Sequence, residues 1–133
     1  MISADSSTGT WQGRYVNNAG SAVDVDSGVS IVAGAWTHIA MIQDNCDINF
    51  YVNGILKSHL TNAGVASFSS ASFADIGAYD YGGDNMVAFF DGLIDDMRIY
   101  DHVLSEGDIR AVMPEPATVL LLGLGGLMLR RKR

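Results

Sequence analysis

One stretch decides the fold: residues 48–58, INFYVNGILKS, place two short apolar runs on either side of Asn53-Gly54. Asn-Gly is the pair that a two-residue type I′ turn favours, because both turn residues take a positive φ. Runs this short, and this rich in β-branched and aromatic residues, are typical of strands. The stretch therefore predicts a β-hairpin in which residues 48–52 pair with residues 55–58.

Similar short runs continue on both sides of this hairpin, separated by turn-forming groups of Asn, Gly and Asp. Strands are expected over 36–42 and 92–100, with successive side chains on opposite faces, and further strands over 10–16, 22–26, 29–32, 73–79 and 86–90. One helical turn is expected near 105–112, with Ser105 as its N-cap and Asp108 at the capping-box position. Many short strands with so little helix predict an all-β fold, an antiparallel β-sandwich of the jelly-roll type.

Charge and composition narrow the functional classes. Residues 1–113 carry fourteen acidic and four basic side chains, a net charge of −10, and thirteen of the fifteen acids in the chain are Asp. So acidic a surface repels phosphate backbones, so we expect no nucleic-acid binding. The single cysteine, Cys46, excludes an intrachain disulfide, and no Cys/His group has the spacing of a zinc site.

Catalytic motifs are sparse. Glycoside hydrolases use two carboxylates across the sugar, yet the only glutamates are Glu106, in the expected helical turn, and Glu115, near the C-terminus. Asp95 and Asp96 are adjacent, so on a strand they would point to opposite faces. No Gly-x-Ser-x-Gly elbow is present. We therefore expect a protein that is not an enzyme.

A calcium site is the metal site that the residue types favour. The densest acidic loop, 80–85, supplies Asp80, Asp84 and Asn85, and Asp91 lies close by in the sequence. Carboxylate and amide oxygens are the hard ligands that Ca²⁺ takes, and the glycines of the loop allow backbone carbonyls to turn inward. Residues 44–47 form a second, weaker candidate. The alternative for both loops is an ordinary turn closed by Asx hydrogen bonds.

The last twenty residues differ from the rest of the chain. They comprise the triplet Pro114-Glu115-Pro116, the thirteen-residue apolar run 117–129 and the basic cluster Arg130-Arg131-Lys132-Arg133. A helix of that length spans about 20 Å, less than the roughly 30 Å of a hydrocarbon core. A transient membrane anchor is therefore expected, with the basic cluster in the cytoplasm and the preceding residues outside.

This tail resembles the PEP-CTERM sorting signal of Gram-negative and related bacteria. The resemblance implies export, cleavage near the triplet by an exosortase, a membrane protease, and release or re-anchoring at the cell surface. An ordinary tail anchor or a core helix is the alternative. The chain thus divides into a domain, 1–113, and a sorting segment, 114–133. Residues 1–6 carry no signal peptide, so we expect the C-terminal part of a longer protein.

An ordered set of motifs carries a second resemblance: WTHIA (36–40), INFYVNG (48–54), IGA (76–78), FDGLIDDMRIY (90–100) and LS (104–105). Over roughly residues 30–110 they resemble the laminin-G-like, concanavalin-A-like jelly rolls. The resemblance implies that Trp36 is a core residue, that His38 is packed rather than a ligand, and that Asp95 has a structural role. The resembled domain is longer, so we expect a sandwich that is N-terminally incomplete.

These resemblances predict a non-catalytic recognition or adhesion module at the cell surface or outside the cell, which binds polysaccharide or protein. Exposed aromatic side chains for a carbohydrate face would come from Trp11, Tyr15, Tyr79 and Tyr81. The alternative is a non-catalytic C-terminal appendage of a larger secreted enzyme that acts on polysaccharide.

Overall fold

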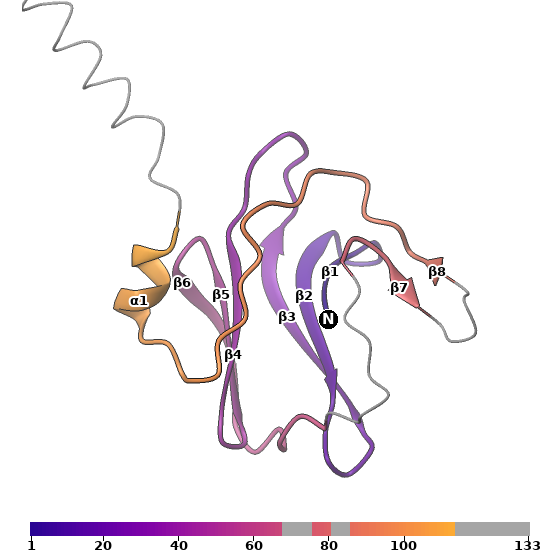
Figure 1. The fold of residues 1–133 in the computed structure, drawn as a ribbon. Helices are drawn as coiled ribbons and strands as arrows, with labels where there is room; N and C mark the ends of the chain where they lie inside the picture. The colour runs from indigo at the N-terminus through magenta and orange to yellow at the C-terminus, as the bar shows by residue number, and fades with distance from the viewer. Residues whose placement is uncertain (68–75, 81–85, 114–133) are drawn as a thin grey trace, which may run out of the picture.

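The computed structural model describes residues 1–67, 76–80 and 86–113 (Figure 1). One antiparallel sheet has the order β1 (Ile2–Asp5), β2 (Thr10–Val16), β3 (Ala22–Ser30), and a second has the order β4 (Ile39–Asp44), β5 (Asp47–Val52), β6 (Ile55–Leu60). A short ladder joins β7 (Tyr79–Asp80) to β8 (Met86–Val87), and helix α1 (Glu106–Ala111) comes last.

The hairpin predicted from residues 48–58 is confirmed. Val52 pairs with Ile55 across the turn, and Asn53 and Gly54 have φ values of 51° and 69°, as a type I′ turn requires. The Asn53 side chain also accepts a hydrogen bond of 2.9 Å from the backbone N–H of His38. The turn therefore fixes the start of β4 as well as the pairing of β5 with β6.

The main core lies between the two sheets. Val25 of β3 packs with Ile48, Phe50 and Val52, which alternate along β5 and are almost completely buried. A Cβ atom on Gly13 of β2 would lie 2.7 Å from the Met41 sulfur and 3.0 Å from the Phe50 ring, so β2 approaches the second sheet closely. The fold is thus all-β with two antiparallel sheets, as predicted and as in a β-sandwich.

Helix α1 covers the other face of the second sheet. Ile109 is fully buried with Ile42 and Tyr51, while Ala40 and Leu104 pack at the edge of this cluster. The predicted capping box is present: Ser105 Oγ accepts from the Asp108 backbone N–H at 3.2 Å, and Asp108 Oδ2 accepts from the Ser105 backbone N–H at 3.0 Å. Strand β5 is therefore buried on both faces, by the first sheet on one side and by helix α1 on the other.

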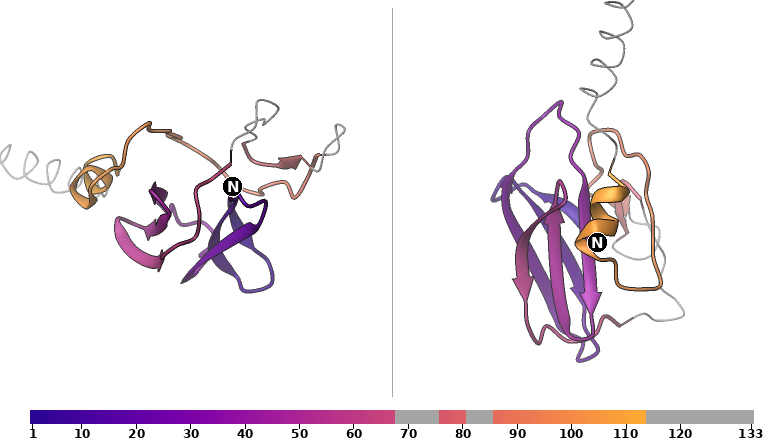
Figure 2. Two further views of the ribbon diagram at one scale, coloured as in Figure 1. Left: turned by 90° about the horizontal axis from the view of Figure 1, so that it is seen from below. Right: turned by 90° about the vertical axis from the view of Figure 1, so that its left-hand side faces the viewer.

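The strand predicted over 92–100 is wrong. These residues pair with no strand among the described residues, and every one of them is exposed. Figures 1 and 2 show the chain from β8 to α1 running outside both sheets. A strand needs a neighbour with free backbone N–H and C=O groups, and among the described residues none pairs with this segment.

Smaller differences concern the other strands. Strand β1 was not predicted. The two strands expected over 22–26 and 29–32 are joined in the single strand β3, which ends at Ser30. Of the two strands predicted over 73–79 and 86–90, only residues 79, 86 and 87 are in strands, and residues 73–75 lie outside the described part of the chain. Within the described ranges no helix is long and apolar enough to cross a membrane. The sorting segment 114–133 lies outside them.

Candidate functional site

The predicted calcium loop falls largely outside the description. Asp84 and Asn85 belong to residues 81–85, which are not described, and for Asp80 only the backbone is placed, paired with Met86. Asp91 is exposed on the segment that follows β8. Across the described residues, no three His, Cys, Asp or Glu side chains gather as a metal site would need. The calcium site therefore stays a prediction.

The second calcium candidate, residues 44–47, is a hairpin turn between β4 and β5. Asp44 pairs with Asp47, and Asn45 has a φ of 53°. Asp44 Oδ1 accepts from the Asn45 amide at 3.0 Å, and Asp47 Oδ1 accepts from the Asn62 backbone N–H at 3.0 Å. These carboxylates close turns, which is the alternative that the sequence left open.

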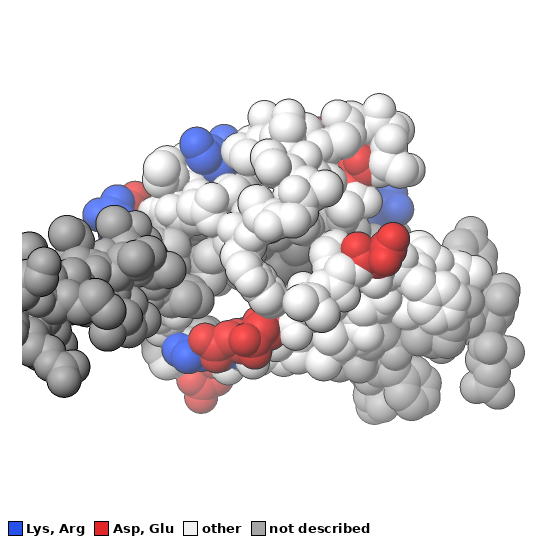
Figure 3. Space-filling view, turned by 90° about the horizontal axis from the view of Figure 1, so that it is seen from above, with Lys and Arg blue, Asp and Glu red and all other residues white. Residues whose placement is uncertain are grey.

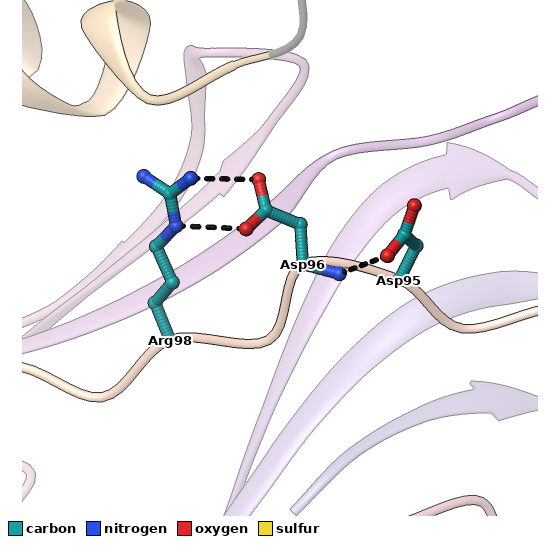
Figure 4. Close-up of polar contacts among 3 residues, drawn as sticks. All are labelled: Asp95, Asp96 and Arg98. Atoms are coloured by element: carbon teal, nitrogen blue, oxygen red, sulfur yellow. Dashed lines mark hydrogen bonds and ion pairs between the residues drawn. The ribbon is translucent and has the colours of Figure 1, made fainter.

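Asp96 and Arg98 form the clearest charged contact on the segment between β8 and α1. The Arg98 Nε and a terminal nitrogen donate to the two Asp96 oxygens at 2.9 and 2.8 Å, a bidentate pair (Figure 4). Asp95 Oδ1 accepts from the Asp96 backbone N–H at 2.8 Å. The described contact of the Asp95 side chain is thus with the backbone of its own segment, a local structural role.

His38 lies directly before β4, near this pair. Burial lowers the pKa of His38, and the positive charge of Arg98 lowers it further. The Asp96 carboxylate raises it. Its Nδ1 is buried and has no hydrogen-bond partner among the residues described. The His38 backbone N–H donates to the Asn53 side-chain oxygen at 2.9 Å, and the His38 carbonyl accepts from the Asn53 backbone N–H at 2.8 Å. A packed, structural His38 agrees with the expectation.

Trp36 is the aromatic residue that sequence reasoning placed wrongly. It was expected in the core, but it is 68% exposed, because β4 begins only at Ile39 and residue 36 lies on the preceding loop. A turn at Gly34, with a φ of 77°, directly precedes it and could have indicated a loop position. An exposed indole is a flat, apolar surface with a polar N–H group, suited to stacking against a ligand.

Two of the aromatic residues expected on a carbohydrate face are instead structural. Tyr15 is partly buried and its hydroxyl donates to the carbonyls of Ala63 and Gly64 at 2.9 and 3.1 Å. Trp11 packs against the main core, with its ring 6.4 Å from that of Phe90. The side chains of Tyr79 and Tyr81 are outside the description. Of the two tryptophans, Trp36 is exposed and open to a ligand, whereas Trp11 is packed against the core.

Exposed apolar side chains gather between β8 and α1. They include Phe89, Leu93, Ile94, Met97, Ile99 and Val103. Figure 3, seen from above, shows a face on which acidic and basic side chains are few and scattered. Large exposed apolar surfaces are common where proteins meet a partner.

Comparison with known proteins agrees with this fold. A family model described as "Concanavalin A-like lectin/glucanases superfamily" matches residues 1–110. No curated protein matches the chain. The crystal structure of an S-layer domain-containing protein from Clostridium thermocellum ATCC 27405 is similar, with a TM-score of 0.53 at 20% identity over 84% of this chain. At that identity the likeness shows the fold alone, and the match spans 60% of the solved chain.

Proposed function

The chain belongs to the concanavalin A-like lectin/glucanases superfamily, and on that premise we propose that it is a non-catalytic recognition module which binds an extracellular polysaccharide or a surface protein. The family match over residues 1–110 is the observation that carries this proposal. The solved structure of similar fold is named for an S-layer domain, which supports a place at the cell surface or outside the cell.

A binding role is supported by the open aromatic surface at Trp36. Its exposed indole lies on a loop that leads into β4, and two residues later the His38 N–H donates to the Asn53 side chain of the hairpin turn. A backbone fixed close to the indole lowers the ordering cost when a ligand stacks on it. We place one contact of the ligand on this residue.

A non-catalytic role is supported by the way the described carboxylates are used. A glycosidase needs one carboxylic acid and one carboxylate about 5 to 9.5 Å apart across a sugar. Asp96 is held by Arg98, and Glu106 pairs with Arg110 at 3.1 Å on the surface of α1. Each of these two acids is paired with an arginine, which supports a role outside an acid–base pair.

Calcium and the sorting tail complete the proposal. Asp80, Asp84, Asn85 and Asp91 hold Ca²⁺ with backbone carbonyls of the intervening loop, which orders the rim of the sandwich. Residues 114–133 act as a PEP-CTERM signal: the apolar run anchors the chain in the inner membrane for a time, and an exosortase cuts it near Pro114-Glu115-Pro116.

The binding role is tested by co-sedimentation of the full chain with insoluble polysaccharides, and by affinity electrophoresis in gels that contain soluble ones. Trp36→Ala should weaken binding of a retained polysaccharide about tenfold, the equivalent of about 1.4 kcal/mol. Val32→Ala is the matched control, because Val32 is 62% exposed on the same loop.

Two outcomes would contradict the proposal. Retention by no polysaccharide, together with no captured protein from the surface of the host cell, would remove the binding role. Release of reducing sugar from a retained polysaccharide would show that the chain is an enzyme.

A further inference from the structure

The Asn53-Gly54 turn is the place where three parts of the chain meet. Asn53 is hydrogen-bonded to the backbone of His38, directly before β4. The turn also lies beneath the end of helix α1 (Figure 1): a Cβ atom on Gly54 would lie 2.7 Å from the Met113 Cε and 3.2 Å from the Arg110 Cγ. The part of the domain that these contacts bring together, which we call the hairpin end, comprises segments 36–40, 52–57 and 109–113.

The sorting segment leaves the domain from the hairpin end. Met113, which contacts Gly54, is the last residue before the triplet 114–116, and the apolar run begins at Ala117. The four residues of chain from Met113 to Ala117 span at most about 14 Å, even when fully extended. While the apolar run is anchored in a membrane, as proposed above, the hairpin end is therefore held close to the lipid surface.

The charge of the hairpin end differs from that of the rest of the domain. Its segments contain none of the fourteen acidic side chains of the domain but two of the four basic ones, Lys57 and Arg110, of which Arg110 pairs with Glu106. The turn at the opposite end of β5 carries Asp44 and Asp47. An anionic lipid surface would attract the basic side chains and repel the acidic remainder of the domain.

Exposed apolar side chains accompany these basic groups. Three large ones belong to the hairpin end: Trp36, Ile55 and Leu56. Tryptophan is enriched where a membrane meets water, because its ring is apolar and its N–H group is polar. Apolar side chains beside basic ones are also the composition of protein surfaces that lie in the interfacial layer of a membrane.

We infer that the hairpin end is a lipid-contacting surface, which lies on an anionic membrane for as long as the sorting segment is anchored. This inference rests on the proposed membrane anchor. It also regulates the binding role proposed for Trp36, because the indole faces lipid while the chain is anchored. Cleavage near the triplet removes the tether and opens Trp36 to a polysaccharide or a surface protein.

Two thiols at opposite ends of β5 test this orientation in the full chain. The natural Cys46, exposed in the β4–β5 turn, is the control, and Ile55→Cys in a Cys46→Ser background places the thiol in the hairpin end. The six residues of β5 separate the two positions by about 20 Å. Each thiol receives the same fluorophore.

The labelled chains are then reconstituted from detergent into vesicles of phosphatidylcholine and phosphatidylglycerol that carry a nitroxide quencher on the lipid headgroup. The label at residue 55 should lose most of its fluorescence, and the label at residue 46 should lose little. Flotation of the vesicles in a density gradient separates two kinds of failure. A chain that does not float lacks the proposed anchor, and the inference falls with it. A chain that floats while both labels are quenched equally keeps the anchor and overturns the inference.

Matched charge variants test the role of the lipid charge. Lys57→Gln and Arg14→Gln each remove one positive charge, the first from the hairpin end and the second from β2, where Arg14 pairs with Asp24. Quenching at residue 55 should fall in Lys57→Gln and remain at its original level in Arg14→Gln. It should also be weaker in vesicles of phosphatidylcholine alone. An equal loss in both variants would overturn the selection of this end of the domain by charge.

Discussion

Ile109 of helix α1 and Tyr51 of strand β5 lie in one buried cluster on the outer face of the second sheet. Ile109 is fully buried, whereas the other five residues of the helix are exposed. A helix of six residues is not stable by itself in water. This contact therefore holds α1, and through it the end of segment 91–103, against the sandwich.

Replacement of that side chain should cost much of the stability of the domain. Ile109→Ala should lower the free energy of unfolding by about 2 to 5 kcal/mol, because it leaves a cavity between helix and sheet. Glu106→Ala on the same helix loses only an exposed ion pair and should cost about 0.5 kcal/mol or less. Urea denaturation followed by circular dichroism compares the two. An equal loss in both variants would show that the helix contributes little to the core.

A methyl group on Gly13 should be destabilising because the two sheets approach closely there. Its Cβ would contact the Met41 sulfur and the rigid Phe50 ring, so Gly13→Ala should cost about 1 to 3 kcal/mol by denaturant titration. Gly107→Ala is the matched control, since it adds the same group to an exposed helix position in ordinary contact distance. It should stabilise by about 0.5 to 1 kcal/mol. The same sign for both variants would contradict the close approach.

The free energy of unfolding should fall in acid, because protonation of Asp108 weakens the capping box of helix α1. The hydrogen bonds from the side chain and the backbone of Ser105 lower the pKa of Asp108 from its ordinary value of 3.8. A lowered folded-state pKa means that this stabilisation is complete above pH 3.8 and is lost as the pH falls through the folded value. Asp108→Asn should therefore flatten the dependence of unfolding on pH below about 4.

The matched variants for this prediction are at Ser105. Ser105→Ala removes the hydroxyl and should cost about 1 kcal/mol at neutral pH; it should also flatten the acid dependence. Ser105→Thr keeps the hydroxyl and should retain that dependence. If Ser105→Ala leaves the acid limb of the curve as steep as in the wild type, the capping contact is not its source.

Calcium should raise the melting temperature if loop 80–85 binds it. At a free concentration one hundred times Kd the gain in stability is about 2.7 kcal/mol. Asp84→Ala should abolish the calcium-dependent shift in calorimetry, whereas Asp101→Ala should retain it, because that carboxylate is fully exposed beside His102 and far along the chain from the loop. No shift with calcium in the wild-type chain would remove the site.

The tail should be absent from the mature protein. In a host that has an exosortase, the protein extracted from the cell surface should lack the residues after about Pro116, because proline keeps the residue before it out of the α region and leaves the triplet extended. Intact-mass spectrometry measures the C-terminus directly. A mature form that still ends in Arg133 would show a permanent anchor instead.

The sequence alone determined the features that depend on a few neighbouring residues. The turn at Asn53-Gly54 and the capping box of Ser105 and Asp108 are set by local φ preference and local hydrogen bonds. Each formed where the residues predicted it. The family also followed from such motifs, because their order along the chain is specific even though each is short.

Only the tertiary structure decided which patterned segments gained a neighbour. Residues 92–100 were predicted as a strand just as residues 36–42 were, yet they form none in the described structure, because pairing needs backbone groups of a distant segment that the local sequence does not specify. Trp36 is exposed for a related reason: β4 begins three residues later, where its pairing with β5 begins, at Ile39 and Val52. Whether a side chain is buried depends on the surface that packs against it as well as on its own apolar character. The position of that surface is set by the tertiary structure.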